Sequence, residues 1–128
     1  MNLKEKLKKR SDEIECGIKD KMNSVANDMK QYIQSKEFDK YVEEMFMRFA
    51  NKKKAKICVY IEDCSKLIVN DETINFDLPE RCLYDLLVAV TFDVASKLYE
   101  LGFTRDDVDA GYHNTIRSRI YSEVTVVW

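Results

Sequence analysis

The sequence predicts an α+β domain with helices first, then short strands, one apolar helix and a closing strand. Two observations predict this class. Apolar residues recur at spacings of three and four over residues 14–49 and again over 83–101, which is the period of a helix. Between these stretches, and again at the C-terminus, the period changes to two, which is typical of a half-buried strand. The chain therefore divides into a helical part, 1–54, and a sheet-and-helix part of ββαβ type, 55–128.

Length and composition predict one domain. A chain of 128 residues is long enough for its own core, and 3 Gly with 1 Pro leave little material for a linker. The N-terminus lacks the apolar run of a signal peptide. Asp85 and Asp93 interrupt the best candidate for a membrane span. We expect a single-domain soluble protein (1–128) of the cytoplasm with no membrane partner.

Two helices are expected in the N-terminal part. Leu3 and Leu7 lie in a basic segment that is expected to form a frayed or a docking first turn, and Ser11 begins a cluster where a helix of about 20 residues can restart. Its apolar positions are Ile14, Ile18, Met22, Val25, Met29 and Ile33. A second helix, or a bent continuation of the first, follows Ser35 and ends near the basic run 52–54. Its apolar positions are Phe38, Tyr41, Val42, Met45, Phe46 and Phe49.

Three short strands should follow as an antiparallel meander. Residues 57–62 alternate between strongly apolar and mixed positions, and 62–65 form a turn. Residues 67–69 and 73–76 are predicted as the next two strands. Asn70 and Asp71 between them suit the left-handed backbone angles of a tight hairpin.

The most apolar element is the predicted helix from Pro79 to Leu101. Asp77 is expected to cap it with Glu80 completing a capping box, and Gly102 to end it. One row of its apolar residues comprises Leu83, Leu86, Leu87, Val90, Val94, Leu98 and Leu101, and a second comprises Tyr84, Val88, Phe92, Ala95 and Tyr99. Because a helix with two apolar rows needs cover on more than one side, we expect both rows to be buried.

After Gly102 the sequence predicts one short helical turn and then a terminal strand. Thr104 and Asp107 suit a capping box, so 105–110 is expected to form a turn of helix that Gly111 stops. The tail has period two, and it forms either one long strand or two joined near 122–123. One parity carries Ile116, Ile120, Val124, Val126 and Trp128, and the other carries Arg117, Arg119, Glu123 and Thr125.

No arrangement of residues in the sequence indicates catalysis. His113 is the only histidine, and the aspartates near it lack the spacing of a calcium loop. Glycines at 17, 102 and 111 cannot form a nucleotide-binding loop. We therefore expect a non-enzymatic protein with no metal and no cofactor. The four cysteines (16, 58, 64 and 82) show neither metal-binding nor redox spacing, so reduced and mostly buried thiols are expected.

Charge is divided unevenly along the chain. Residues 1–56 carry 15 Lys and Arg against 10 Asp and Glu, a net charge of +5, whereas residues 57–128 carry 6 against 13, a net charge of −7. Several acidic residues fall at predicted turns, where they could present a negative face to a basic partner or serve only the turn backbone. The candidate partner-binding residues are Glu62, Asp63, Asp71, Glu72, Asp106, Asp107, Asp109 and Tyr112. Direct nucleic-acid binding is not expected, since the chain is acidic overall and no recognition-helix signature occurs.

The plan of the chain resembles that of small phage-encoded proteins, including the Cas9-inhibiting anti-CRISPR proteins of Listeria phages. Leu98, residues 101–103, the pair Gly111 and Tyr112, and the closing segment 124–128 carry this resemblance. It covers most of the chain in layout but contains no specific motif, so it transfers no functional residue. An acidic insertion before Gly111 and the long N-terminal helices depart from it. The resemblance implies a non-enzymatic binding protein directed at a host protein, acting in the host cytoplasm.

Three functions remain open on this basis. The first is an inhibitor that blocks a host nucleic-acid-handling enzyme, such as a Cas nuclease, through its acidic turns. The alternative is a phage structural or assembly protein whose N-terminal helices form a homodimer or larger oligomer. The third is a minor nucleic-acid binder or an enzyme without a recognisable motif. The row Ile18, Met22, Val25, Met29 and Tyr32 either forms the oligomer seam or packs on the domain's own core.

Overall fold

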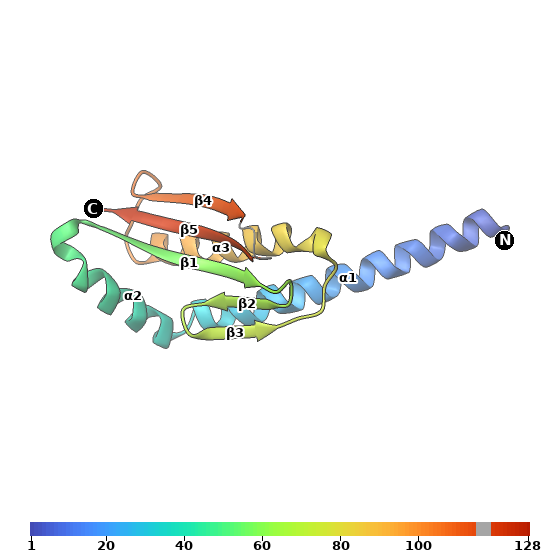
Figure 1. Ribbon diagram of the computed structural model, residues 1–128, viewed down its shortest axis with the longest axis horizontal. Coiled ribbons are helices and arrows are strands. Elements are labelled where there is room, and N and C mark those ends of the chain that lie inside the picture. Colours follow the sequence, from blue (N-terminus) through green and yellow to red (C-terminus); the bar gives the residue numbers. More distant parts are fainter. Residues whose placement is uncertain (115–118) are drawn as a thin grey trace.

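The computed structural model describes residues 1–114 and 119–128 and has the α+β fold that the sequence predicts (Figure 1). Two 3₁₀ turns, at Ala50–Lys52 and Glu80–Cys82, precede β1 and α3 respectively. The helices and strands are α1 (Leu3–Ile33), α2 (Lys36–Arg48), β1 (Lys54–Glu62), β2 (Lys66–Val69), β3 (Glu72–Asn75), α3 (Leu83–Glu100), β4 (Val108–Asn114) and β5 (Arg119–Val127).

The five strands form one antiparallel sheet in the order β3-β2-β1-β5-β4. β1 lies at its centre and pairs with β5 along its whole length, whereas β2 pairs only with Val59–Glu62. The predicted meander is confirmed, and Asn70 has the positive φ expected in its hairpin. Because β1 and β5 are far apart in the sequence, only the folded chain brings them together.

The short helix predicted at 105–110 is wrong, because its first half is a turn and its second half, from Val108, belongs to β4. Thr104 and Asp107 do exchange capping-type hydrogen bonds: the Thr104 N–H donates to Asp107 Oδ2 at 2.9 Å and the Asp107 N–H to the Thr104 carbonyl at 3.1 Å. These bonds close a single turn. From Val108 onward the backbone pairs with β5 instead of continuing as a helix.

The C-terminal strand has the predicted parity in the described residues. β5 is one strand from Arg119 to Val127, and Val124 and Val126 are buried on the helix side of the sheet. Trp128 follows it and stacks on Phe46 of α2 with ring centroids 5.4 Å apart. Ile116 and Arg117, to which the predicted pattern also extended, lie outside the described residues.

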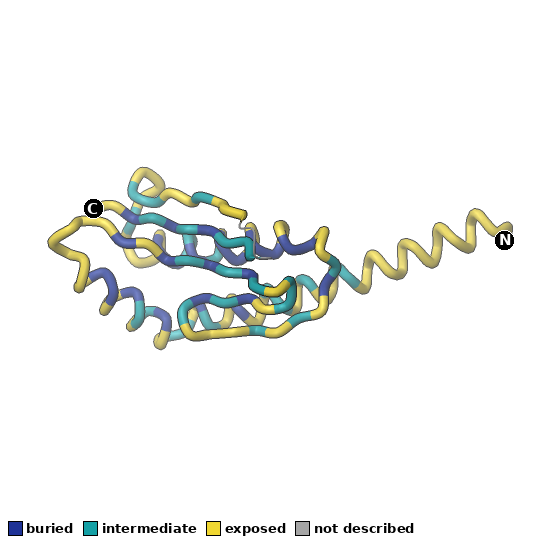
Figure 2. Tube along the Cα trace, viewed as in Figure 1, coloured by how far each residue is buried: buried dark blue, intermediate teal, exposed yellow. Residues whose placement is uncertain are grey.

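α1 is one helix of 31 residues, so the predicted restart near Ser11 is wrong. The Asn2 side chain caps it by accepting a hydrogen bond from the Glu5 N–H at 2.9 Å. Its first half projects from the domain and is exposed to solvent (Figures 1 and 2). A helix that is already nucleated extends at little cost, so these turns need no separate start signal.

The second half of α1 packs on the domain's own core. Met29 and Ile33 are buried, and Ile18, Met22, Val25 and Tyr32 pack against the same cluster. The row that the sequence left open as an oligomer seam is therefore used within the chain. Where α1 leaves the domain, the guanidinium of Arg81 donates to both carboxylate oxygens of Glu15. These hydrogen bonds lower the pKa of the Glu15 carboxyl.

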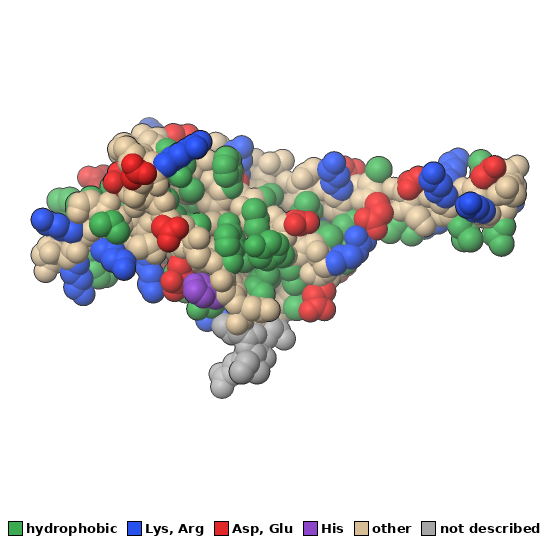
Figure 3. All heavy atoms as spheres, turned by 90° about the horizontal axis from the view of Figure 1, so that it is seen from above, with side chains coloured by type: hydrophobic (Ala, Val, Ile, Leu, Met, Phe, Trp, Pro, Cys, Tyr) green, Lys and Arg blue, Asp and Glu red, His purple; other side chains and the backbone are tan. Residues whose placement is uncertain are grey.

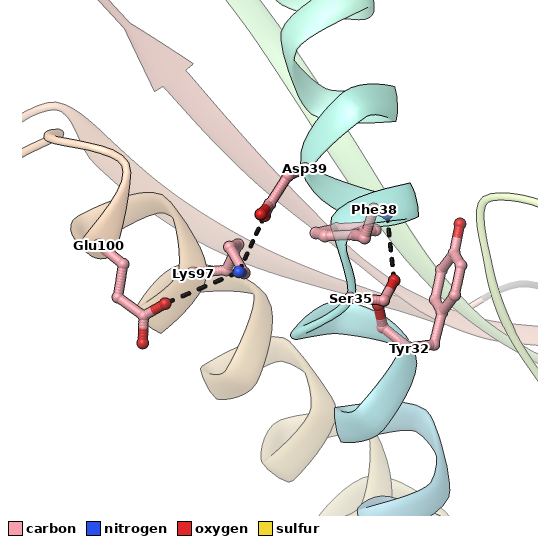
Figure 4. A network of polar contacts seen from close by, with 6 residues as sticks. All are labelled: Tyr32, Ser35, Phe38, Asp39, Lys97 and Glu100. Atoms are coloured by element: carbon pink, nitrogen blue, oxygen red, sulfur yellow. Dashed lines mark hydrogen bonds and ion pairs between the residues drawn. The ribbon is translucent and has the colours of Figure 1, made fainter.

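α2 is a separate helix with Ser35 as its cap. The Ser35 hydroxyl accepts from the Phe38 N–H at 3.2 Å and donates to the Tyr32 carbonyl, which fixes the corner between α1 and α2 (Figure 4). Figure 4 also shows Lys97 of α3 between Asp39, at 2.8 Å, and Glu100, at 3.7 Å. The pairing of Lys97 with Asp39 joins α2 to α3.

The start of α3 differs from the prediction, whereas its end agrees. Asp77 does not cap the helix; a 3₁₀ turn begins after Pro79, whose carbonyl accepts from the Cys82 N–H at 2.9 Å, and α3 follows at Leu83. Gly102 adopts φ +110°, and the Phe103 N–H donates to the Leu98 carbonyl at 3.1 Å. This is a glycine-terminated helix end.

The cysteines are less buried than predicted. Cys82 is buried, Cys58 and Cys64 are partly exposed, and Cys16 lies exposed on the projecting half of α1. The prediction of mostly buried thiols is wrong because Cys58 lies on the solvent face of the sheet and Cys64 in a turn, positions where an apolar side chain is only partly covered.

Candidate functional site

The acidic candidate residues lie in three separate places. Glu62 ends β1, where it accepts from Arg119 of β5, and Asp63 follows in the turn to β2. Asp71 lies in the turn between β2 and β3, and Glu72 begins β3. The group at 106–109 precedes and begins β4, at the opposite edge of the sheet from β3. The structure therefore does not gather these side chains into one acidic surface.

Tyr112 lies apart from the aspartates that precede it. It points to the helix side of the sheet, where its ring meets that of Tyr84 at the start of α3 with centroids 5.7 Å apart. Asp109 has the other parity of β4 and so lies on the opposite face. The aromatic anchor that the sequence placed beside the acidic cluster is thus an anchor for α3.

The second apolar row of α3 is exposed, which contradicts the expectation that both rows are buried. Tyr84 is 57% exposed, Val88 37%, Phe92 70% and Tyr99 39%. Tyr112 of β4, 40% exposed, continues the row onto the sheet edge. We call these five residues the α3–β4 surface. Figure 3 shows hydrophobic side chains gathered in the middle of the face seen from above, next to the histidine.

The position of α3 between its neighbours explains this exposure. Leu87, Val90 and Leu98 are buried against the core. α1 and α2 lie on the flank that carries Asp93 and Lys97, where Lys97 is only 7% exposed. No described element lies on the remaining flank, beyond β4, so the second row faces solvent.

A buried pair of hydroxyl groups holds α3 on the sheet beside this surface. Thr91 Oγ1 donates to the Leu87 carbonyl at 2.6 Å and lies 2.6 Å from Ser122 Oγ of β5. Because the Thr91 proton is used within the helix, Ser122 is the donor to Thr91. The α3–β4 surface is therefore carried by an element that the sheet fixes in place.

A hollow lies between α2 and the solvent face of the sheet. It encloses about 650 Å³, with Tyr41 and Phe49 on the α2 side and Lys54, Lys56 and Tyr60 on β1. Lys56 is paired with Glu123 at 3.2 Å. The phenol of Tyr60 has a pKa raised to about 12, chiefly by its hydrogen bond with Cys58 and further by burial. This groove is basic, as the lysine run in the sequence indicates.

Residues 1–114 and 119–128 contain no cluster of three potential metal-ligating side chains. His113 stacks on Tyr121 with centroids 4.9 Å apart, and its Nε2 lies 3.8 Å from Glu123 Oε2. None of the helices in the described part of the chain has the length and apolar content that crossing a bilayer requires. No protein-family model, curated protein or solved structure matches the chain.

The sequence singled out Tyr112 but not the four residues that α3 contributes to the α3–β4 surface, because their helical spacing assigned them to the core. The available signal was their composition: three of the five are tyrosines, whose hydroxyl suits a position that is apolar at one end and wet at the other. The inner row contains only aliphatic residues.

Proposed function

We propose that the chain is a non-enzymatic protein-binding protein and that the α3–β4 surface is where its partner binds. The observation that carries this proposal is the continuous exposed row of Tyr84, Val88, Phe92 and Tyr99 beside Tyr112. Isolated apolar residues are common on protein surfaces, but contiguous apolar patches are typical of interaction sites.

The residue types favour a protein partner. Tyrosine and other aromatic residues dominate the binding energy of many protein interfaces, and burying one such side chain contributes about 1.5–3 kcal/mol. The patch is carried on a fixed helix, so little conformational entropy is lost when it binds. Its charged neighbours, Asp85 and Glu100, lie on the adjoining flank of α3 and would form a polar rim.

Site-specific photo-crosslinking in the source organism tests the proposal. A photoreactive benzoylphenylalanine replaces Phe92 in one variant and Met47 of α2 in the control, since the two side chains are 70% and 72% exposed. We expect a protein adduct from position 92 and none from position 47. Adducts from neither position, or equally from both, would refute the proposed surface.

The narrower hypothesis is that the partner is a host nucleic-acid-handling enzyme that the chain inhibits. It is supported by the resemblance to phage proteins and by the acidic group Asp106, Asp107 and Asp109. This group lies before and at the start of β4, at the same edge of the sheet as Tyr112, so a partner that covers this edge would meet its charge. A basic partner would then associate quickly and in a salt-dependent way.

One observation favours a second candidate function, assembly through the N-terminal helix. Leu3, Leu7 and Ile14 are exposed on the projecting half of α1, at 71%, 59% and 48%, and share one side of the helix. Copies could associate through this stripe. Replacing Leu7 with Glu should then abolish oligomers, whereas the same change at Lys6, on another side of the helix, should not.

A further inference from the structure

We propose that the partner of the α3–β4 surface is a second copy of this chain, joined by antiparallel pairing of β4 with β4. The inference rests on the proposed function and names its partner. Two unpartnered features lie together at this edge of the molecule: the exposed apolar row of α3 and, within the described residues, the free edge of a seven-residue strand. One second copy covers both.

The hydrogen-bond phase of β4 identifies its free backbone groups. The Val127 N–H donates to the Asp107 carbonyl at 2.9 Å, so residues 107 and 127 form a hydrogen-bonded pair. In the register of β4 with β5, 109 and 111 then also bond to β5. The N–H and C=O groups of Val108, Ala110, Tyr112 and Asn114 point away from β5, towards the open edge.

With a two-fold axis through Gly111, these outward-facing backbone groups can hydrogen-bond to those of the second copy along the whole strand. This axis places Ala110 of one copy opposite Tyr112 of the other, and Val108 opposite Asn114, so outward-facing backbone groups meet each other. The small Ala110 leaves room for the opposing aromatic ring on the helix side. Shifting the axis to Ala110 or to Tyr112 pairs fewer residues.

Charge favours the same register. On the solvent face, the axis through Gly111 places Asp109 of one copy opposite His113 of the other, twice by symmetry. The imidazole N–H can donate a hydrogen bond to the carboxylate opposite it, whereas an axis through Asp109 would place two carboxylates together, which is unfavourable. Gly111 itself meets Gly111 on the axis, without a side chain to obstruct the contact.

The same symmetry operation brings the apolar rows of the two helices together. Tyr84 contacts Tyr112, so the N-terminal part of the α3 row lies over the β4 edge. Antiparallel strand pairing also sets the two α3 helices antiparallel, with the Tyr84 and Val88 regions facing each other. The interface is isologous and closes at two copies, as in most soluble oligomers.

The opposite sheet edge is a poorer site for such pairing. β3 has four residues, and α1 packs beside it. Short edge strands and edges covered by a helix are two ways in which proteins prevent strand addition. β4 is longer, and neither feature protects it in the described part of the chain.

Sedimentation velocity of the full chain at micromolar concentration is the first test. We expect a dimer, which Ala110→Pro weakens by a factor of about ten or more because the lost N–H and the ring face the second copy. Thr73→Pro on β3 is the matched control: by the pairing of Phe76 with Ser65, its N–H also points away from the neighbouring strand, here β2. This control should stay dimeric, and circular dichroism should show both variants folded.

Disulfide trapping tests the register. Facing residues of a non-hydrogen-bonded antiparallel pair have Cα atoms about 4.5 Å apart, within the range that a disulfide spans. In a Cys16→Ser background, Gly111→Cys should therefore form a covalent dimer on oxidation. A Cβ at 111 comes no closer than 3.4 Å to His113 Nε2, so the variant should fold. Asp109→Cys, which faces residue 113 of the other copy, should not form one.

Three outcomes would overturn the inference: a monomeric wild-type chain, a dimer that Ala110→Pro leaves intact but Leu7→Glu breaks, or a Gly111→Cys variant that does not cross-link. If the wild-type chain is monomeric but photo-crosslinking from position 92 still yields an adduct with another protein, only the second copy is refuted as the partner. A monomer with no adduct refutes the proposed function as well.

Discussion

The two apolar rows of α3 belong to one helix but lie in opposite environments. Leu87, Val90 and Val94 of the inner row are at most 1% exposed, whereas Phe92 and Tyr84 of the outer row are more than half exposed. Both rows follow the same helical period over the same residues. The difference shows that the periodicity of a helix identifies its apolar sides but not how many layers cover them.

The inner row should be the more sensitive to mutation, and this is the largest effect we predict. Leu87→Ala should lower the free energy of unfolding by about 2–5 kcal/mol, since it loses burial and leaves a cavity in the core. Val88→Ala, the next residue on the outer row, should cost less than about 1 kcal/mol. Urea denaturation of both variants measures the contrast; equal losses would mean that the outer row is also buried.

Mutation of the buried hydroxyl pair, Thr91 and Ser122, should lower the free energy of unfolding by a smaller amount. Thr91→Val removes the acceptor of the buried Ser122 hydroxyl, and leaving such a group unpaired costs about 1–3 kcal/mol. Adding Ser122→Ala should restore part of that stability because no unpaired group then remains. If the double variant is less stable than Thr91→Val in thermal denaturation, the pair is not coupled as described.

The packing of α2 against α3 should depend on Lys97. Replacing this buried lysine with Met removes the charge that pairs with Asp39. Because the Asp39 side chain is 41% exposed, water replaces much of the interaction, and we expect a loss of about 1 kcal/mol. Glu100→Gln, which removes only the longer contact, serves as the control in the same chemical denaturation. A stabilised Lys97→Met variant would contradict the prediction.

The acidic group before and in β4 should contribute least to stability. Converting Asp106, Asp107 and Asp109 to Asn should leave the melting temperature nearly unchanged, because the amide that replaces the Asp107 carboxylate retains an oxygen to accept the Thr104 N–H. With a basic partner, the triple variant should associate more slowly and with a weaker dependence on salt. Surface plasmon resonance at several salt concentrations measures both; an unaltered rate and salt slope would exclude a role for this group in binding.

Local signals in the sequence predicted the elements that depend on neighbouring residues. Ser35 separates α1 from α2 because its hydroxyl caps the start of α2, accepting from the Phe38 N–H three residues on. Gly102 ends α3 because its backbone adopts a positive φ that other residues disfavour. The alternation in residues 57–62 identified β1, and the residues 70–71 identified the β2–β3 turn. These features account for the α+β class.

The candidate site could not be predicted in the same way. Thr104 and Asp107 carry capping chemistry that suits a helix or a closed turn equally well, and β4 exists because β5 offers it hydrogen-bond partners. Tyr112 was singled out as an anchor for a partner, yet its ring packs on Tyr84 of α3. Both outcomes depend on contacts between segments that the sequence separates.

By itself, the sequence determined the periods of the helices and strands, the Ser35 cap, the helix end at Gly102 and the β2–β3 turn, since these arise from interactions within a few residues. The tertiary structure alone decided which apolar row of α3 is buried and which strand lies at the edge. The physical reason is that burial depends on how many layers pack around an element. α3 has the sheet on one side and the helices α1 and α2 on one flank, and the row beyond β4 is left exposed.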